Sequence, residues 1–442
     1  MKKILWFRRD LRVDDSMLLA QDGEVLPIFI FDKKILNTLE KNDKRVYFIY
    51  QSVLKLKENL QKIGLDLAIF HSTPIEVFTN LKAKGFDEVY ASVDYNAYAQ
   101  QRDEEISEII SLHLLNDSYI FDKDEILKSD GTPYLVFTPY YKAGQQLYTK
   151  FHALSYTKGT HTLGNFAYDT YPKLEDMGFL SLHVKIIPPE RKLLLLKEKL
   201  ENYTENRDFL AMDATSHLSV DLRFGTISIR SILRYLMALK KEGFDTQPFF
   251  RQLVFRDFYA YLLYHFPNLA WKNYKYEPPT LFNESYFEAF CNAKTGYPLI
   301  DAAIMELKTT GDMHNRSRMV VGSFFTKHLL LPWQEGEAFF AKYLMDYDAA
   351  SNVLSWQWCA GTGIDPQPYF RIFNPYDQSK KFDKEAVYIK KWLPLLKDIS
   401  AKNLHNESFL FKTDIKGYPK PIVGHEEARK RFLTLFKVSN HH

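Results

Sequence analysis

The sequence predicts an α/β domain with a doubly wound parallel sheet, followed by a domain built almost entirely of helices. Over the first third of the chain, apolar and β-branched runs alternate with amphipathic helical stretches, which is the pattern of a parallel sheet covered on both faces. Beyond this region helical spacing dominates and strand signals are scarce. We therefore expect an α/β domain over residues 1–130, a linker over 131–191 and a helical domain over 192–442.

Each predicted strand of the first domain is a short apolar run, and the helices between the strands are amphipathic. The strands are expected at Lys3–Phe7, Val25–Phe31, Leu67–His71 and Glu88–Val93, and the helices at Asp43–Ile63 and Pro74–Lys84. No GxGxxG motif follows the first strand, so the usual dinucleotide-binding fingerprint is missing. The segment WFRRDLR lies at the carboxyl edge of the sheet, where such folds bind ligands. Asp10 and Arg12 within it could equally form a loop salt bridge.

The linker and the helices after it are also visible in the sequence. Periodicity is lost from about Ser155 to Arg191, where prolines and glycines accumulate. Helical spacing then predicts helices at Leu193–Tyr203, Ile227–Glu242, Pro248–His265, Leu299–Leu307, Arg316–Leu331 and Glu335–Met345.

Composition is that of an ordinary globular protein, with 46% hydrophobic and 26% charged residues. No apolar run approaches the roughly 20 residues that span a bilayer, and the start becomes charged too soon for a signal peptide, so we expect a cytoplasmic protein. Two cysteines, Cys291 and Cys359, are too few for a disulfide framework or an iron–sulfur cluster, and we expect no metal. The net charge of +3 does not by itself indicate nucleic acid. An aromatic content of 15% fits flavin or base stacking.

The most informative stretch runs from Asp346 to Pro375. Asp346, Asp348 and Asn352 can hold a heteroaromatic ring system by its hydrogen-bonding edges, and Trp356 and Trp358 can stack on a base or pass an electron. The alternative is a buried aromatic helix with satisfied polar caps.

Three other segments of the helical domain carry chemistry. In Tyr203–Arg230, the hydroxyls of Thr215, Ser216 and Ser219 lie where a loop enters a helix, which suits a pyrophosphate, although such caps are often only structural. Arg251–Tyr261 interleaves aromatic and basic residues. The segment GDMHNRSRM, at 311–319, places so many polar side chains at a helix start that phosphate or base contacts are favoured over a core.

These segments, in this order, resemble the photolyase/cryptochrome family and within it the bacterial class I cyclobutane pyrimidine dimer DNA photolyases. The resemblance runs nearly end to end. It covers WFRRDLR, PYLVFTPYYKA at Pro133–Ala143, the 203–219 block, KTGYPLIDAA at Lys294–Ala303, MHNRSRM, WQW, and YFRIFNP at Tyr369–Pro375.

The resemblance implies an FAD held by the helical domain. The cofactor-binding residues that it implies are Tyr203, Thr215, Ser216, His217, Leu218, Ser219, Arg256, Arg318, Asp346, Asp348 and Asn352. Asn352 would touch flavin N5, and an amide there is the choice of the repair enzymes, because it can hydrogen-bond N5 with or without a proton. Plant photoreceptors of the family place an acid at this position.

The implied activity is light-dependent DNA repair. Fully reduced FADH⁻ would absorb blue or near-UV light and pass an electron to a cyclobutane pyrimidine dimer flipped out of UV-damaged DNA, which then splits. The residues implied to face the DNA are Gln252, Phe255, Asn315, Arg316, Met319 and Trp358. We expect a monomer without membrane contact, whose DNA binding weakens as salt rises.

Three departures from the family pattern concern the substrate, the photoreduction relay and the antenna. In the dimer pocket Gln252 replaces an acid, Phe255 a tryptophan and Asp312 another tryptophan. Trp356 and Trp333 match the first two members of the relay, but its surface tryptophan is missing, and Trp271, Tyr274 or Tyr276 could substitute. Tyr98 and Ala99 stand where a folate antenna would be held, so the antenna could be absent, a deazaflavin or another flavin.

Four alternatives remain open at this point. Gln252 also occurs in the (6-4) photolyase and animal cryptochrome branches, but their His-His pair is absent here. The pocket changes would suit a blue-light photoreceptor, which Asn352 opposes. A light-independent flavin oxidoreductase would need a nicotinamide site, and a pure nucleic-acid-binding module would carry no flavin.

Overall fold

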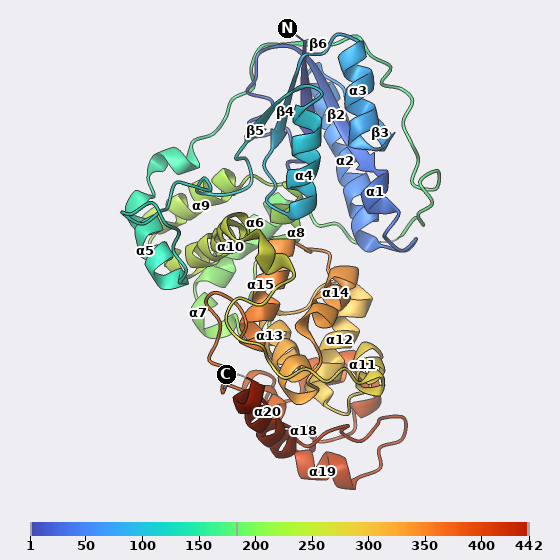
Figure 1. Cartoon of the computed structure of the whole chain (residues 1–442), viewed down its shortest axis with the longest axis vertical. Helices are drawn as coiled ribbons and strands as arrows, with labels where there is room; N and C mark the ends of the chain where they lie inside the picture. Colours follow the sequence, from blue (N-terminus) through green and yellow to red (C-terminus); the bar gives the residue numbers. More distant parts are fainter. Residues whose placement is uncertain (1, 183, 440–442) are drawn as a thin grey trace. The chain divides into compact units, whose positions relative to one another are not determined.

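The chain divides into two compact units, a sheet unit and a helical unit. The computed structural model describes residues 2–182 and 184–439. The sheet unit comprises Met1–Tyr134, Thr138–Glu201 and Ser216–His265, and the helical unit comprises Leu135–Phe137, Asn202–Thr215 and Phe266–His442. Figure 1 shows the elements of both units coloured along the sequence.

The sheet unit is built on a parallel sheet with the strand order β3-β2-β1-β4-β5. Its strands are β1 (Lys2–Phe7), β2 (Gly23–Asp32), β3 (Ala68–Ser72), β4 (Glu88–Ser92) and β5 (Ser111–Leu115), and a short β6 (His161–Leu163) pairs with the start of β2. The order reverses between β1 and β4, which confirms the doubly wound class. The sequence pattern misses β5 and β6, because β5 has no fully buried residue and β6 has only three residues.

Helices cover both faces of this sheet. On one face, Ile4 and Trp6 of β1 pack with α3 (Pro74–Ala83), where the rings of Trp6 and Phe78 lie 4.9 Å apart, and with α4 (Ala97–Ser107). On the other face, Phe31 of β2 contacts Tyr50 of α2 (Lys44–Lys62). Successive strand residues point to opposite faces, so these apolar runs can bury side chains on both.

The segment WFRRDLR is used for internal ion pairing. The Arg8 guanidinium lies 2.6 Å from Asp103 of α4. Arg12 pairs with Asp117 at 2.7 Å rather than with Asp10, and Asp117 also accepts from Arg230. Burial raises the pKa of Asp10 to about 6. Of the two interpretations left open for Asp10 and Arg12, the loop salt bridge between them is not the one observed, because Asp117, far along the chain, takes the Arg12 guanidinium.

Every regular element described after β6 is helical, as predicted. The sheet unit contains α6 (Pro189–Leu200), α8 (Ser219–Phe224), α9 (Ile229–Lys241) and α10 (Gln247–His265). The helical unit contains α7 (Tyr203–Asn206), α11 (Glu284–Cys291), α12 (Pro298–Thr310), α13 (Asn315–Ser323), α14 (Trp333–Tyr343), α15 (Ala349–Ala360), α16 (Pro375–Phe382), α17 (Val387–Trp392), α18 (Ala401–Leu404), α19 (Glu407–Lys412) and α20 (His425–Ser439). Besides α2, α3 and α4, the helices before β6 are α1 (Lys33–Leu36) and α5 (Phe137–Leu147). Among the described residues, no helix combines the length and apolar character needed to traverse a bilayer.

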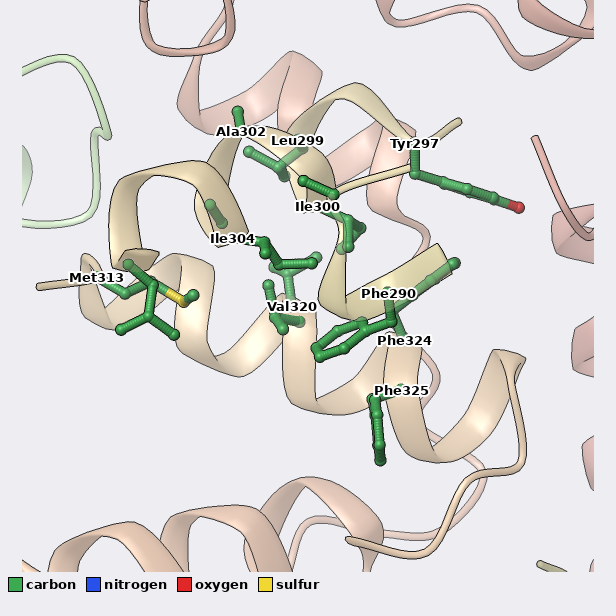
Figure 2. Close-up of a cluster of buried hydrophobic side chains, with 14 of the residues drawn as sticks. Phe290, Tyr297, Leu299, Ile300, Ala302, Ile304, Met313, Val320, Phe324 and Phe325 are labelled. Atoms are coloured by element: carbon green, nitrogen blue, oxygen red, sulfur yellow. The ribbon is translucent and has the colours of Figure 1, made fainter. Parts of the chain in front are cut away.

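The core of the helical unit lies around α12 and α13, which pack against each other (Figure 2). Fully buried Phe290, Phe324 and Phe325 meet there, and the rings of Phe290 and Phe325 are 4.7 Å apart. The single helix predicted over 316–331 is in fact α13 followed by a π-helical turn at Phe324–His328. It ends early because Leu330 adopts a left-handed backbone, φ 58°, ahead of Pro332.

The π-helical turn contains His328, which is buried against His425, and this pair makes the folded protein less stable in acid. His328 Nε2 lies 2.8 Å from His425 Nδ1 of α20, and burial lowers the pKa of His328 to about 3. The unfolded value is about 6.5, so the folded chain binds fewer protons between these values. The contribution of neutral His328 to the free energy of unfolding is complete above pH of about 6.5. It is lost as the pH falls towards 3, by up to about 1.4 kcal/mol per pH unit.

We expect His328→Phe to flatten the fall in the free energy of unfolding below pH of about 6.5, because the titrating group is gone. Urea unfolding followed by tryptophan fluorescence at a series of pH values measures this. Equal slopes for both proteins in acid would contradict it, and the range above pH of about 7, where the slopes should agree, is the internal control.

Candidate functional site

Helix α15 and its N-cap carry Asp348, Asn352, Trp356 and Trp358 of the most informative stretch, and Asp346 lies just before it. Asp348 is its N-cap, and its carboxylate accepts from the backbone N–H of Ser351 at 3.1 Å. Asn352 and Trp356 follow at intervals of four residues, so all three share one face of the helix. Asn352 is only 7% exposed and Trp356 only 3%, whereas Trp358 is half-buried.

Asp346 is held by Arg318 of α13. Arg318 Nη2 lies 3.0 and 3.2 Å from the two carboxylate oxygens of Asp346 and 3.2 Å from Asp312 Oδ1. Burial acts to lower the pKa of Arg318, but Asp346 and Asp312 outweigh it and the pKa is raised. One cation therefore holds two acids.

A glycine makes this pairing possible. Gly311 ends α12 with φ 78°, and a Cβ built there would lie 2.5 Å from Met345 Cγ. The backbone N–H of Met345 donates to the carbonyl of Gly311 at 2.7 Å. The residue that follows is Asp346, so the close passage of the two backbones brings its carboxylate to α13.

Asn352 is oriented by Glu337 of α14, which the sequence analysis did not single out. Asn352 Nδ2 donates to Glu337 Oε1 at 2.9 Å and to the backbone carbonyl of Glu337 at 3.1 Å. Burial raises the pKa of Glu337, and the hydrogen bonds from Asn352 and Tyr347 partly offset this. No donor among the described residues reaches Asn352 Oδ1. The available signal was spacing, because Glu337 lies four residues after Trp333 on one helix face.

Trp356 and Trp333 lie close together in the interior. The ring of Trp356 rests on Gly336, where a Cβ would meet it at 2.3 Å, and Gly336 lies one turn after Trp333 on α14. Trp356 Nε1 is buried and has no hydrogen-bond partner in the described part of the chain. Trp333 is also buried, and its Nε1 donates to Asn273 Oδ1 at 2.8 Å.

The start of α13 presents the predicted lesion-side residues. His314 is its N-cap and accepts from the backbone N–H of Arg316 through Nδ1 at 3.1 Å. Asn315 is exposed, and its amide lies 3.7 Å from Met319 Sδ one turn later. Asn315 and Met319 therefore share one face at the helix start, where Asn315 is exposed.

Arg316 is engaged within the protein. Its Nη2 lies 2.6 Å from Asp208, and its guanidinium stands over the ring of Phe382 at 4.4 Å. The sequence predicted a phosphate contact here, and Asp208 now stands as an internal competitor for that phosphate.

The segment predicted to bind a pyrophosphate, 203–219, belongs to both units: its residues up to Thr215 are part of the helical unit, and those from Ser216 are part of the sheet unit. In the helical unit, Tyr203 is buried under the guanidinium of Arg207 and Thr215 is half-buried. In the sheet unit, Ser219 begins α8, as expected of a loop that enters a helix. The turn before it comprises Ser216, which accepts from the N–H of Leu218 at 3.3 Å, left-handed His217 with φ 54°, and fully buried Leu218.

Helix α10 in the sheet unit presents a stripe of half-buried side chains: Gln252, Phe255, Arg256 and Tyr259. Arg256 donates to the backbone carbonyls of Ser118 at 2.6 Å and Leu222 at 3.2 Å, so it supports the end of α8. The amide of Gln252 makes only a long contact, 3.4 Å, with the carbonyl of Pro248.

At the carboxyl edge of the sheet, Tyr98 donates to Asp32 of β2, and the guanidinium of Arg102 lies 5.8 Å from the centre of the Tyr98 ring. Ala99 is buried on α4 next to it. The described residues contain no group of three or more His, Cys, Asp or Glu side chains that could hold a metal ion.

Comparison with known proteins identifies the class. Residues 249–438 match the FAD binding domain of DNA photolyase, and residues 3–156 match the DNA photolyase domain. A deoxyribodipyrimidine photo-lyase of Alkalihalophilus pseudofirmus is 32% identical over 98% of this chain and 98% of its own length. The chain belongs to the photolyase/cryptochrome family, which confirms the resemblance seen in the sequence.

Solved structures agree. A class III photolyase of Agrobacterium tumefaciens is 29% identical with a TM-score of 0.87, covering 100% of this chain and 98% of the other. An archaeal photolyase of Sulfolobus tokodaii, described with two FAD molecules, is 31% identical with a TM-score of 0.85, covering 99% and 100%. The predicted fold class is confirmed.

FAD is the cofactor of this family domain, and the residues present fit it. Asn352 Oδ1 accepts no hydrogen bond from the residues that the structure describes, whereas its amide nitrogen donates twice to Glu337. The Arg318–Asp346 pair adds further hydrogen-bonding groups beside α15. The predicted FAD is therefore supported by the family and by the available donors and acceptors of the helical unit.

Proposed function

We propose that this protein is a light-dependent DNA lyase that splits cyclobutane pyrimidine dimers in UV-damaged DNA. The observation that carries the proposal is the fixed amide of Asn352, whose Nδ2 is bound twice by Glu337 so that Oδ1 is presented. Relatives named deoxyribodipyrimidine photo-lyase, at 32% identity over nearly the full length, support the same activity.

The proposed role of Asn352 follows from its orientation. A free amide could hydrogen-bond flavin N5 with or without a proton, but here Nδ2 is taken by Glu337. The presented carbonyl oxygen would accept from a protonated N5 and repel an unprotonated one, which offers only a lone pair. The amide therefore favours the reduced cofactor, which is the form that the reaction needs. When bound and reduced, FAD supplies the photoexcited electron that splits the dimer. The protein binds the cofactor, orients it and excludes water.

The other predicted cofactor residues fall into two groups, one for the phosphates and ribityl chain and one for the edges of the rings. We propose that Tyr203, Thr215 and the turn Ser216–Ser219 contact the phosphates and ribityl chain, and that Arg318, Asp346 and Asp348 hold the ring edges. Arg256 acts through α8, because both of its terminal nitrogens already donate to backbone carbonyls.

On the DNA side, we propose that Asn315, Met319 and Trp358 face the flipped-out dimer, together with Gln252 and Phe255 of α10. An exposed amide and a half-buried aromatic ring suit a damaged base pair, which is already weakly stacked. Arg316 would exchange Asp208 for a phosphate, so its net gain on binding is smaller than that of a free cation.

The decisive experiment is illumination of the reduced protein with two oligonucleotides, one carrying a single cyclobutane dimer and one a (6-4) product. We expect recovery of the thymines only from the first, measured by chromatography against dark controls. Gln252→Glu should raise the yield, because a carboxylate accepts hydrogen bonds more strongly than an amide. Repair of the (6-4) product alone would replace the proposed substrate, and no repair of either would overturn the lyase activity in favour of a photoreceptor.

Glu337 offers a separate prediction. Glu337→Leu removes one acceptor of the Asn352 amide, whereas Glu337→Gln keeps an acceptor oxygen and serves as the matched control. We expect the midpoint potential of the bound flavin to fall by about 10–30 mV in the leucine variant, the equivalent of one lost hydrogen bond. Redox titration monitored by flavin absorption measures this. Equal potentials in both variants would show that Glu337 does not orient the amide.

For the photoreduction relay we propose Trp271 as the surface terminus. Trp333 donates to Asn273, two residues from Trp271, and Gln334 beside Trp333 contacts the Trp271 carbonyl at 3.5 Å. Trp271 is 50% exposed, so its oxidised indole can give its Nε1 proton to water. Tyr276 instead packs edge-on against Tyr369.

Trp271→Phe should slow light-driven reduction of the oxidised cofactor by an external thiol at least several-fold, because the hole then stays on buried Trp333 and returns. Tyr274→Phe and Tyr276→Phe are the matched controls and should reduce at the wild-type rate. Flavin absorption under constant illumination gives the rates. A slow Tyr274→Phe or Tyr276→Phe variant beside a normal Trp271→Phe variant would move the terminus to that tyrosine.

A further inference from the structure

A tight aromatic stack joins helix α20 to the loop that follows α15. The rings of Tyr369 and Phe436 lie face to face, with centres 4.1 Å apart and planes within 5°. Tyr276 packs edge-on against both rings, at 6.2 Å from Tyr369 and 5.6 Å from Phe436. α20 is itself docked in the helical unit through buried Phe432. The loop therefore has an anchor on Phe436, more than sixty positions after Tyr369 in the sequence.

The backbone of this loop, residues 361–371, is held at several other points. Gln367 is buried and donates to the carbonyl of Cys359 at 2.8 Å. The N–H of Arg371 donates to the carbonyl of Pro368 at 2.9 Å, and buried Lys327 donates to the carbonyl of Arg371 at 3.0 Å. Tyr369 lies between Gln367 and Arg371 in the sequence, and its stack on Phe436 is the attachment that α20 provides.

The loop nevertheless directs side chains outward. Pro368, Phe370 and Arg371 are exposed, and Phe370 is 61% exposed. A single exposed apolar residue is ordinary at a protein surface. Here, however, the ring of Tyr369 and the backbone of Arg371 are held, so Phe370 and Arg371 extend outward from a fixed stretch of backbone. An aromatic ring beside a cation is the combination that binds unstacked bases and phosphates.

We propose that α20 positions the 361–371 loop for contact with damaged DNA, with Phe436 as the positioning residue. This rests on the proposed function, because the loop continues directly from the helix that carries Trp358. Phe436 does not touch DNA in this arrangement. It acts by holding Tyr369, which restricts the loop before binding and lowers the entropy cost of ordering it on the DNA.

The test compares Phe436→Ala with Phe436→Tyr, which keeps a stacking ring, and with Val438→Ala, a control on the same helix where the side chain is 68% exposed. We expect Phe436→Ala to bind a dimer-containing duplex about 2- to 10-fold more weakly, while its affinity for undamaged duplex stays the same. Hydrogen exchange of residues 361–371 in the free holoprotein should rise in this variant. Phe436→Tyr and Val438→Ala should match the wild type in both measurements.

Phe436→Leu keeps apolar volume without a ring, so it serves where Phe436→Ala loses its flavin or unfolds. Unchanged loop exchange in the leucine variant would overturn the proposal, as would equal weakening of damaged and undamaged DNA binding. If the wild-type protein bound dimer-containing and undamaged duplex equally well, that result would overturn the proposed function instead. The exchange comparison, which needs no DNA, would still decide whether α20 fixes the loop.

Discussion

The close approach of α14 and α15 is the constraint on which the arrangement of the helical unit depends. Gly336 has no side chain, and the Trp356 ring occupies the space that a Cβ would fill. This lets Glu337, the residue after Gly336, reach Asn352, whose Nδ2 donates to both the side-chain and the backbone oxygen of Glu337. α13 meets α15 in a similar way, where Gly322 lies against Cys359. Larger residues at these two glycines would separate the helices that carry the acids, the amide and the tryptophans.

Charge in this region is balanced locally. Arg318 holds Asp346 and Asp312, and Arg316 is matched by Asp208. Such pairs cost desolvation energy and are weak evidence for stability, but they fix where donors and acceptors point. As a consequence, most of these side chains use one polar atom for a hydrogen bond inside the protein and leave another polar atom for a ligand. Asn352, bound at nitrogen and open at oxygen, is the clearest case.

Much of the fold was predictable because its signals are local. The four predicted strands lie within one or two residues of their observed bounds, since buried parallel strands are continuous apolar runs. The missed β5 is an edge strand without a fully buried residue, so no such run exists. Among site residues, Asp348 as a helix cap and Ser219 as a helix start follow from local chemistry. The spacing from Trp333 placed Glu337 on a helix face but did not show that it binds Asn352, and Asp208 looks like any solvated charge until its partner is known.

The sequence by itself determined the family, the two architectural classes and the residue types offered to a flavin, because ordered motifs and hydrophobic periodicity are written along the chain. Only the tertiary structure decided how those residues are used. Arg12 pairs with Asp117 instead of Asp10, Arg256 supports backbone carbonyls, and Asn352 presents its oxygen. Each of these outcomes depends on a partner distant in sequence, and a partner of that kind is selected by packing in three dimensions and leaves no periodic or local trace.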